Sequence, residues 1–222
     1  MPTGSQNLRL ILVGPPGVGK GTQAALLTSR LGLVALSSGE IFRREIEAKT
    51  DLGRLADSYI QHGQLVPNGV TIEMMSKRLR EMEIRRSGFI LDGFPRTLRQ
   101  AVALSEILAE LETPLTKCVA LEVSDDIIVE RLSGRLGCTR CGEIYHSKNK
   151  VPHREGLCDK CDSPLIVRAD DEAATILERL RVFREATAPV IGYYEEQGLL
   201  QRVDTADGPE PTYAEIVGPL PL

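Results

Sequence analysis

The stretch GPPGVGKGT, residues 14–22, directly follows the apolar run 8–13 and opens a helical pattern over residues 20–31. A glycine-rich turn between a strand and a helix points several main-chain N–H groups inward, and the helix N-terminus adds partial positive charge. Lys20 can reach the outer phosphates of a bound nucleotide. The usual loop of this kind has Ser or Thr directly after the lysine, whereas here Gly21 intervenes before Thr22. The stretch therefore predicts a nucleotide-phosphate site at the end of a first strand.

Outward from this loop, short apolar runs alternate with helical patterns. Strands are predicted at residues 8–13, 32–36, 88–91, 117–123 and 199–203. Helices are predicted at 20–31, from Ser38, at 97–111, from Ser124, at 171–197 with a kink or break at Pro189, and at 212–217. Strands that are buried on both faces and separated by helices form parallel sheets covered by helices. The pattern predicts a doubly wound α/β fold of three layers around a parallel five-stranded sheet.

Two stretches interrupt this alternation. Residues 37–66 have helical patterns with no strand between them, and residues 134–171 carry Gly, Cys and His with little helical signal. Both are predicted to be insertions on a core formed by residues 1–36, 67–133 and 172–222.

The composition restricts the class of protein. The chain has 222 residues, of which 42% are hydrophobic and 26% charged, as in soluble globular proteins. A net charge of -4 and the absence of Trp argue against a general nucleic-acid surface. Membrane spans are not expected because no run of about 18 apolar residues occurs. The first seven residues lack the layout of a signal peptide, so a cytoplasmic location is expected.

Four of the five cysteines form two pairs with the spacing Cys138-x2-Cys141-x16-Cys158-x2-Cys161. Such pairs in a reducing cytosol indicate metal ligands, and four thiolates suit a closed tetrahedral structural zinc site. Iron in place of zinc, a pair of disulfides, and a zinc ribbon that binds nucleic acid remain alternatives. Cys118 lies in the apolar run 118–121 and is predicted to be a core residue.

A second chemical motif, DGFPR, covers residues 92–96 at the end of the third predicted strand. In open α/β sheets, ligands bind at the carboxyl ends of the strands. Asp92 can hold the water ligands of Mg²⁺ there, and Arg96 can bind a second phosphate. Further arginines gather around the two insertions: Arg43, Arg131, Arg135, Arg168 and Arg179. Each alone would be a solvated surface charge, but together they are typical of phosphoryl transfer, which needs several fixed cations.

The positions of the histidines indicate the kind of acceptor. His62, His146 and His153 all lie outside the loop and the DGFPR motif, and each is expected to be a surface or core imidazole. A sugar or serine hydroxyl as acceptor would need a general base, whereas a phosphate is already an anion at neutral pH. The sequence therefore favours a nucleoside monophosphate as the acceptor.

Seven motifs occur in order: GPPGVGKGT (14–22), LSSGEIFR (36–43), GQLVP (63–67), DGFPRTLRQ (92–100), ERLSGR (130–135), RADD (168–171) and TAPVIGYY (187–194). In this set the chain resembles the adenylate kinase family, in its longer form with a large lid, over about residues 8–203. The resemblance implies a P-loop core, an AMP-binding insertion at 37–66 and a zinc-bearing lid at 134–171. It also implies a monomer that converts ATP and AMP into two ADP with Mg²⁺, in adenine nucleotide homeostasis and salvage, without nucleic-acid or membrane partners.

The resemblance also implies roles for individual residues. The phosphates of ATP would be bound by Gly17, Val18, Gly19, Lys20, Gly21 and Thr22. Its base would be lined by Ile144 and Tyr145, with Arg131 stacking nearby and Glu210 acting through its backbone. The AMP site would contain Ser38, Arg43, Gln64, Leu65, Val66, Gly93, Phe94, Pro95, Arg96, Gln100, Arg168 and Arg179. The catalytic cations would be Lys20, Arg96, Arg135, Arg168 and Arg179.

Gln100 bears on the choice of acceptor. Its amide can pair with the donor and acceptor edge of adenine, whereas related pyrimidine monophosphate kinases carry Asn at this place in the family pattern. Ser38 stands where many family members have Thr, and both supply a hydroxyl. Two rival functions remain at this stage: a GMP, UMP or CMP kinase, and a P-loop regulatory or nucleic-acid-binding ATPase.

Overall fold

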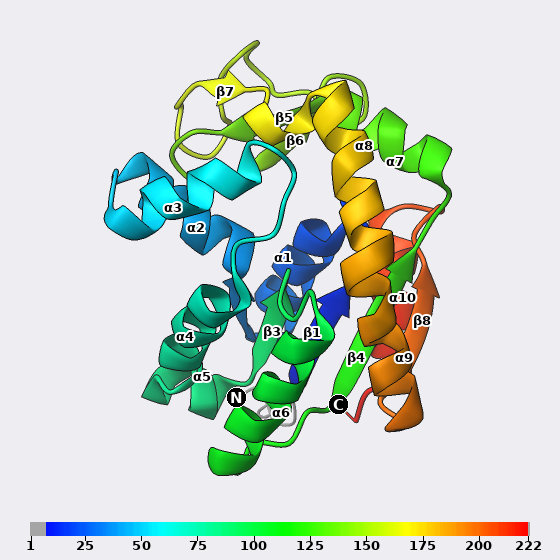
Figure 1. The fold of residues 1–222 in the computed structure, drawn as a ribbon. Coiled ribbons are helices and arrows are strands. Elements are labelled where there is room, and N and C mark those ends of the chain that lie inside the picture. Colours follow the sequence, from blue (N-terminus) through cyan, green and yellow to red (C-terminus); the bar gives the residue numbers. More distant parts are fainter. Residues whose placement is uncertain (1–7, 222) are drawn as a thin grey trace.

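Five parallel strands form the central sheet of the computed structural model, which describes residues 8–221 (Figure 1). In spatial order they are β2 (Val34–Ser37), β3 (Phe89–Asp92), β1 (Arg9–Val13), β4 (Lys117–Glu122) and β8 (Leu200–Asp204). Ile11 in β1 lies opposite Leu91 in β3 and Cys118 in β4. The predicted parallel five-stranded sheet is therefore confirmed, with β2 two residues later than expected at its start.

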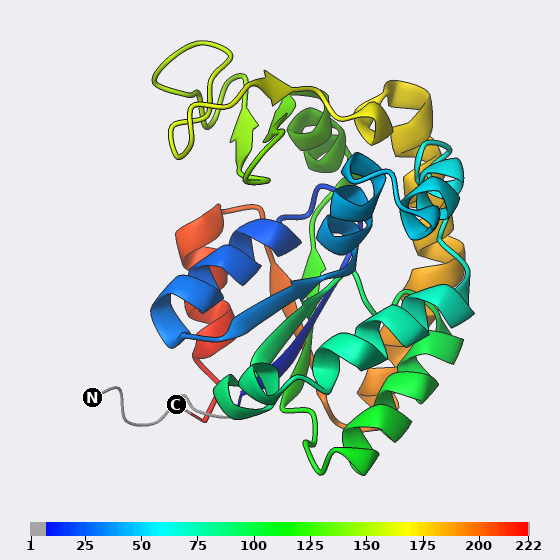
Figure 2. The ribbon, with the colours of Figure 1, turned by 90° about the vertical axis from the view of Figure 1, so that its left-hand side faces the viewer.

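Helices cover both faces of this sheet (Figure 2). One face carries α1 (Lys20–Leu31) and α10 (Pro209–Val217), and the other carries α4 (Asn68–Leu79), α5 (Met82–Ser87), α6 (Leu98–Glu110) and α9 (Ala188–Glu196). Neither α4 nor α5 was among the predicted helices. No helix within residues 8–221 has both the length and the apolar character needed to cross a membrane.

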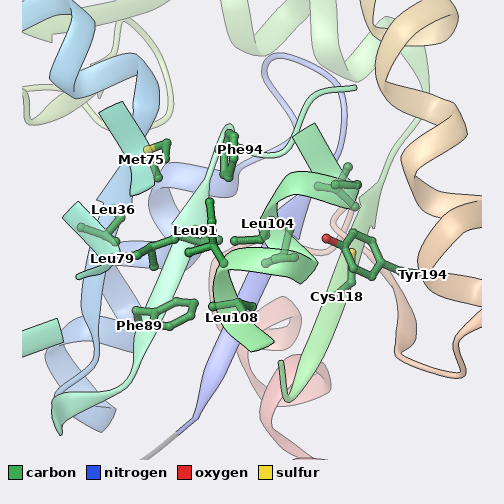
Figure 3. Close-up of a cluster of buried hydrophobic side chains, with 14 of the residues drawn as sticks. Leu36, Met75, Leu79, Phe89, Leu91, Phe94, Leu104, Leu108, Cys118 and Tyr194 are labelled. Carbon is green, nitrogen blue, oxygen red and sulfur yellow. The ribbon is translucent and has the colours of Figure 1, made fainter. Parts of the chain in front are cut away.

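The alternating direction of the side chains along β1 explains why a hydrophobic core lies on each face of the sheet. Leu10 and Leu12 pack under α1 and α10, while Ile11 and Val13 face the other side. Successive side chains of a strand point to opposite faces, so a run of apolar residues supplies two cores at once. Figure 3 shows the second core, in which Tyr194 from α9 lies beside Cys118. Burial raises the pKa of the Cys118 thiol to about 12, which agrees with its predicted core role.

The long C-terminal helix is divided differently from the prediction of 171–197. A 3-10 turn (Ala169–Asp171) precedes α8 (Ala173–Val182), a π-helical turn (Phe183–Thr187) follows, and α9 continues the column. In the π turn the Ala188 N–H bonds back to the Phe183 carbonyl. Pro189 has no N–H and its ring crowds the preceding turn, so the wider turn accommodates it without ending the helix.

Residues 37–66 form two helices, α2 (Ser38–Glu47) and α3 (Asp51–Ile60), with no strand between them, as expected. Ser37 and Thr50 cap them by accepting hydrogen bonds from the Glu40 and Gly53 N–H groups. The pair encloses its own small core, which comprises Phe42, Ala56 and Val66.

Residues 134–171 form a small antiparallel sheet above the central one (Figure 1). Its strands are β6 (Ile144–His146), β5 (Arg135–Cys138) and β7 (Leu165–Ile166), in that spatial order. None of these strands was predicted, since strands of two to four residues carry too little periodicity to recognise. The helix α7 (Asp125–Ser133) leads into β5 and packs on α8 through Ile128 and Leu132.

Candidate active site

The loop of residues 14–19 joins β1 to α1 at the carboxyl edge of the sheet. Gly17 and Gly19 have φ angles of 80° and 107°, a region that residues with a Cβ rarely adopt. A Cβ on Gly17 would also lie 2.8 Å from the Leu132 side chain on α7. Gly19 precedes α1 without any side-chain cap, and no acidic residue lies in the first turn. The N–H groups at this helix start are therefore left to face an anion.

Lys20 lies over the loop, where its Nζ donates to the Gly14 and Pro15 carbonyl oxygens at 2.8 Å each. Burial lowers the pKa of Lys20 to about 7. Asp92 opposes this shift, whereas the positive charges of Arg96, Arg179 and Arg135 add to it. The structure thus brings the phosphate-binding loop together with Asp92 and three of the predicted arginines.

Two further arginines belong to the same cluster. Burial, together with the charges of Arg43 and Arg135, lowers the pKa of Arg168 to about 9. Arg168 lies against β5, since a Cβ on Gly137 would be 3.1 Å from its Nε. Burial also lowers the pKa of Arg43. Six cations from distant segments therefore meet at low solvent exposure, an arrangement that favours a ligand with several negative charges.

Two carboxylates hold part of this cluster in place. Asp171, whose side chain has no exposed surface, accepts two bonds from Arg135 at 2.6 and 2.5 Å and one from Arg179 at 2.8 Å. Asp170 lies 3.1 Å from Arg179. Burial alone would raise the pKa of Asp170, but the Arg179 and Arg135 charges outweigh it and lower that pKa. Sequence reasoning assigned no role to either acid, although both lie in the RADD motif.

A pocket opens between the α2–α3 insertion and the end of β3. Its walls include much of the predicted AMP site: Ser38, Arg43, Gln64, Leu65, Val66, Gly93, Arg96, Gln100 and Arg179. Ser38 Oγ donates to the Gly93 carbonyl oxygen at 2.7 Å, which ties α2 to β3. Arg96 Nε donates to the same oxygen at 2.8 Å. The pocket joins the arginine cluster at Arg96 and Arg179.

Some predicted AMP-site residues contribute less directly. The Phe94 side chain is fully buried in the core of the sheet (Figure 3), and the pocket wall does not include this residue. Val66 packs into the core of the α2–α3 pair as well as lining the pocket. The exposed Gln64 side chain donates to Glu178 on α8. Pro95 is buried and does not appear in the pocket wall.

The residues predicted for the ATP base are distributed more widely. Arg131 donates to Val18 O at 3.3 Å and to Thr205 O at 2.6 Å, beside the loop. Tyr145 is buried with its hydroxyl 3.6 Å from Cys158 Sγ, so its side chain belongs to the core of the small sheet. The Ile144 side chain is half-buried. The Glu210 carboxylate forms a surface ion pair with Arg30 at 2.6 Å.

Four cysteines come together in the small sheet, as their spacing predicted. The sulfur atoms of Cys138, Cys141, Cys158 and Cys161 all lie within 4.8 Å of one another. Tetrahedral zinc with Zn–S bonds of about 2.3 Å requires sulfurs about 3.8 Å apart. The Cys138–Cys161 and Cys141–Cys158 contacts of 3.4 and 3.5 Å are close to that value. The thiols are free, so the disulfide alternative is not observed, and the four residues fit a structural metal ion.

Comparison with known proteins agrees with this geometry. The family model described as adenylate kinase matches residues 12–199. A protein named adenylate kinase from Acidothermus cellulolyticus is 45% identical over 213 residues, covering 96% of this chain and 98% of its own length. One from Clostridium botulinum (strain 657) is 44% identical over 209 residues, or 94% and 96% of the two chains. One from Moorella thermoacetica is 46% identical over 197 residues, or 89% and 90%.

Proposed function

Because the chain belongs to the adenylate kinase family of phosphotransferases, we propose that it catalyses reversible, Mg²⁺-dependent transfer of a phosphoryl group from ATP to AMP, which yields two ADP. The observation that carries the proposal is the cluster of six cations between a phosphate-binding loop and the pocket beside α2. A single anionic ligand would neutralise only part of this positive charge. Two phosphorylated ligands whose phosphate groups lie next to each other would neutralise all of it. The role would be adenine nucleotide homeostasis and salvage.

In the proposed reaction, the main-chain N–H groups of the loop and the start of α1 bind the phosphates of ATP. Lys20 exchanges its bonds to two loop carbonyls for bonds to the outer phosphates. Asp92 would hold water ligands of Mg²⁺, and the ion would neutralise part of the charge of the ATP phosphates. The loop and Lys20 thereby fix the donor phosphate in line with the acceptor.

AMP would occupy the pocket beside α2, with its phosphate among Arg43, Arg96 and Arg179. A phosphate oxygen of AMP attacks the terminal phosphorus of ATP, and the bond to the bridging oxygen of ADP breaks. Since the attacking oxygen is already anionic, no side chain has to remove a proton. Catalysis then consists of placement and of charge neutralisation by the arginines as negative charge shifts toward ADP.

The small sheet at residues 134–171 would act as a lid. Arg135 at the start of β5 and Arg168 at the hinge of the lid would move onto the transferring phosphate when the lid closes. Closure excludes water, which otherwise would accept the phosphoryl group, and reopening would limit turnover. The four-cysteine site, filled by zinc, would stabilise a sheet with little core of its own. We further propose a cytoplasmic monomer with residues 37–66 as its AMP-binding domain.

A coupled assay with Mg²⁺-ATP tests the proposal. We expect ADP to form rapidly with AMP, and far more slowly with GMP, UMP, CMP or no acceptor. Lys20→Ala should lower kcat by orders of magnitude while circular dichroism and the melting temperature stay near wild type. Comparable rates with another monophosphate would assign a different kinase. ATP consumption without an acceptor, or tight oligonucleotide binding, would favour an ATPase instead. Near-normal turnover in Lys20→Ala would rule out the proposed chemistry.

A further inference from the structure

The amide of Gln100 is held from both ends at the inner wall of the pocket. The Arg96 main-chain N–H donates to Gln100 Oε1 at 2.7 Å, and Gln100 Nε2 donates to Asn68 Oδ1 at 2.9 Å. Asn68 Oδ1 also accepts from Thr97 Oγ1 at 3.0 Å. Gln100 is 2% exposed, so water cannot easily replace these partners.

The direction of the amide follows from the chemistry of its partners. A main-chain N–H can only donate, so the Gln100 atom that faces Arg96 must be the carbonyl oxygen. Its NH₂ group therefore faces Asn68, and a flipped amide would set two donors against each other at Arg96. Asn68 reinforces this choice because its oxygen already accepts from Thr97 and is ready for a second donor.

The anchors themselves lie on two helix starts. Asn68 is the first residue of α4, and Thr97 caps α6 by accepting the Gln100 N–H at 3.2 Å. The two helices pack on each other on the same face of the sheet. The position of Asn68 relative to Gln100 is thus set by helix packing rather than by a mobile loop.

A fixed amide recognises one polarity of base. Gln100 keeps one N–H and one carbonyl lone pair for a ligand in the pocket. Adenine offers an acceptor at N1 beside a donor at its 6-amino group, whereas a 6-oxopurine offers a donor at N1 beside an acceptor at O6. An amide free to flip could pair with either edge, but an amide held in one direction pairs with only one of them.

We propose that Asn68 is a specificity-determining positioning residue: with the Arg96 main-chain N–H, it holds the Gln100 amide in the orientation that accepts adenine and rejects 6-oxopurines. The inference rests on the proposed function, since it places the base of AMP against Gln100. Sites that hydrogen-bond a substrate reject analogues of the wrong polarity strongly, because buried groups are then left unpaired.

The test compares AMP with IMP as acceptors, since the two differ at the 6-position and N1 alone. In Asn68→Leu, loss of one buried hydrogen bond should raise KM for AMP about tenfold, with kcat within about twofold of wild type. The ratio of kcat/KM for AMP to that for IMP should fall about tenfold. Asn68→Asp is the matched control, because a carboxylate still accepts from both Gln100 and Thr97. It should retain the wild-type ratio.

Equal losses for AMP and IMP in Asn68→Leu, or the same loss of selectivity in Asn68→Asp, would overturn the inference. If Asn68→Leu does not fold, calorimetric titration of Asn68→Ala with each monophosphate replaces it. If the ratio of the AMP affinity to the IMP affinity in Asn68→Ala equals that of the wild type, the inference is overturned. Wild-type protein that forms no ADP from ATP and AMP would instead overturn the proposed function. That outcome appears before any substitution is made, so the two failures are distinguishable.

Discussion

Arg135 and Asp171 form a two-point ion pair across 36 residues of sequence, with Nε–Oδ2 and Nη2–Oδ1 distances of 2.6 and 2.5 Å. Asp171 also binds Arg179 and has no exposed side-chain surface, while the two arginine side chains are 15% and 19% exposed. One buried carboxylate therefore joins the first lid strand to α8. The same two residues, Arg135 and Arg179, are among the groups proposed to bind the substrate phosphates.

Replacing this carboxylate should destabilise the free protein. In Asp171→Asn we expect the free energy of unfolding to fall by about 3 kcal/mol, because the largely buried Arg135 loses its carboxylate partner and Arg179 keeps only Asp170. That loss corresponds to a drop of about 6–12 °C in melting temperature. ADP with Mg²⁺ should restore part of the difference, since its phosphates replace the missing charge.

Glu110→Gln serves as the matched control for this measurement. Glu110 pairs with Arg80 at 2.6 Å, but both side chains are half exposed or more, so the loss should be about 0–1 kcal/mol. Equal effects of the two substitutions in thermal melts would show that Asp171 has no special role.

Lys20 should make nucleotide binding depend on pH. Its pKa in the free protein is lowered to about 7, and phosphates around it would raise that value again. Above pH 7 the free protein has therefore lost the proton that the complex holds, so binding takes up a proton. The affinity for Mg²⁺-ATP should fall as pH rises from 7.5 to 9.5, by up to about tenfold per unit. Titration calorimetry in buffers of different ionisation enthalpy measures the uptake directly.

Lys20→Ala is the control for the proton uptake. Its weaker binding should be almost independent of pH over the same interval. If the wild-type protein bound ATP without proton uptake at pH 8.5, Lys20 would retain its proton in the free protein, contrary to this expectation.

Gly53 determines how closely α2 and α3 pack. A Cβ at this position would lie 2.0 Å from the Glu45 carbonyl oxygen and 2.7 Å from the Ile46 nitrogen, both main-chain atoms that cannot turn aside. Gly53→Ala should therefore push the two helices apart, lower the free energy of unfolding by about 1–3 kcal/mol and raise KM for AMP.

Gly69→Ala provides a comparison at another helical glycine. A Cβ on Gly69 meets no atom within 4 Å, so this substitution should be neutral or stabilise the protein by about 0.5–1 kcal/mol. Denaturant titrations of both variants give the two free energies. A Gly53→Ala variant as stable as Gly69→Ala would mean that the helix pair adjusts freely.

The four-cysteine site should hold one metal ion per chain. We expect elemental analysis to find zinc, and a colourless protein, whereas iron on four thiolates would absorb visible light. Cys158→Ser should lose most of the metal and become sensitive to proteolysis within residues 134–171, because the lid core consists largely of the ligands themselves. Activity should fall with it, since Arg135 and Arg168 are carried by the lid.

Cys118→Ala distinguishes this metal site from a general effect of removing a thiol. Cys118 lies in the core of the sheet, away from the cluster, and its substitution should leave the metal content unchanged. Equal metal content in Cys158→Ser and wild type would show that the four sulfurs do not form the site.

Local features of the chain were sufficient to predict the parallel sheet and the phosphate-binding loop. Apolar runs alternate with helical patterns, which predicts the sheet. A glycine-rich turn between a strand and a helix, as at residues 14–22, is typical of a phosphate-binding loop. The cysteine spacing likewise predicted the cluster, since two Cys-x2-Cys turns already bring their sulfurs into pairs. By contrast, the strands β5, β6 and β7 are too short for periodicity, and the π turn before Pro189 depends on how α8 and α9 continue one column.

The sequence by itself determined the layered fold and the phosphate-binding loop, because these depend on neighbours within a few residues. Only the tertiary structure decided which partners individual side chains have: Asp171 for Arg135, Asn68 for Gln100, and Cys158 for the hydroxyl of Tyr145. Such contacts join residues that helix packing and sheet order bring together from 13 to 36 positions apart. No local sequence pattern predicts these contacts, because each depends on the position of a whole helix or strand in the folded protein.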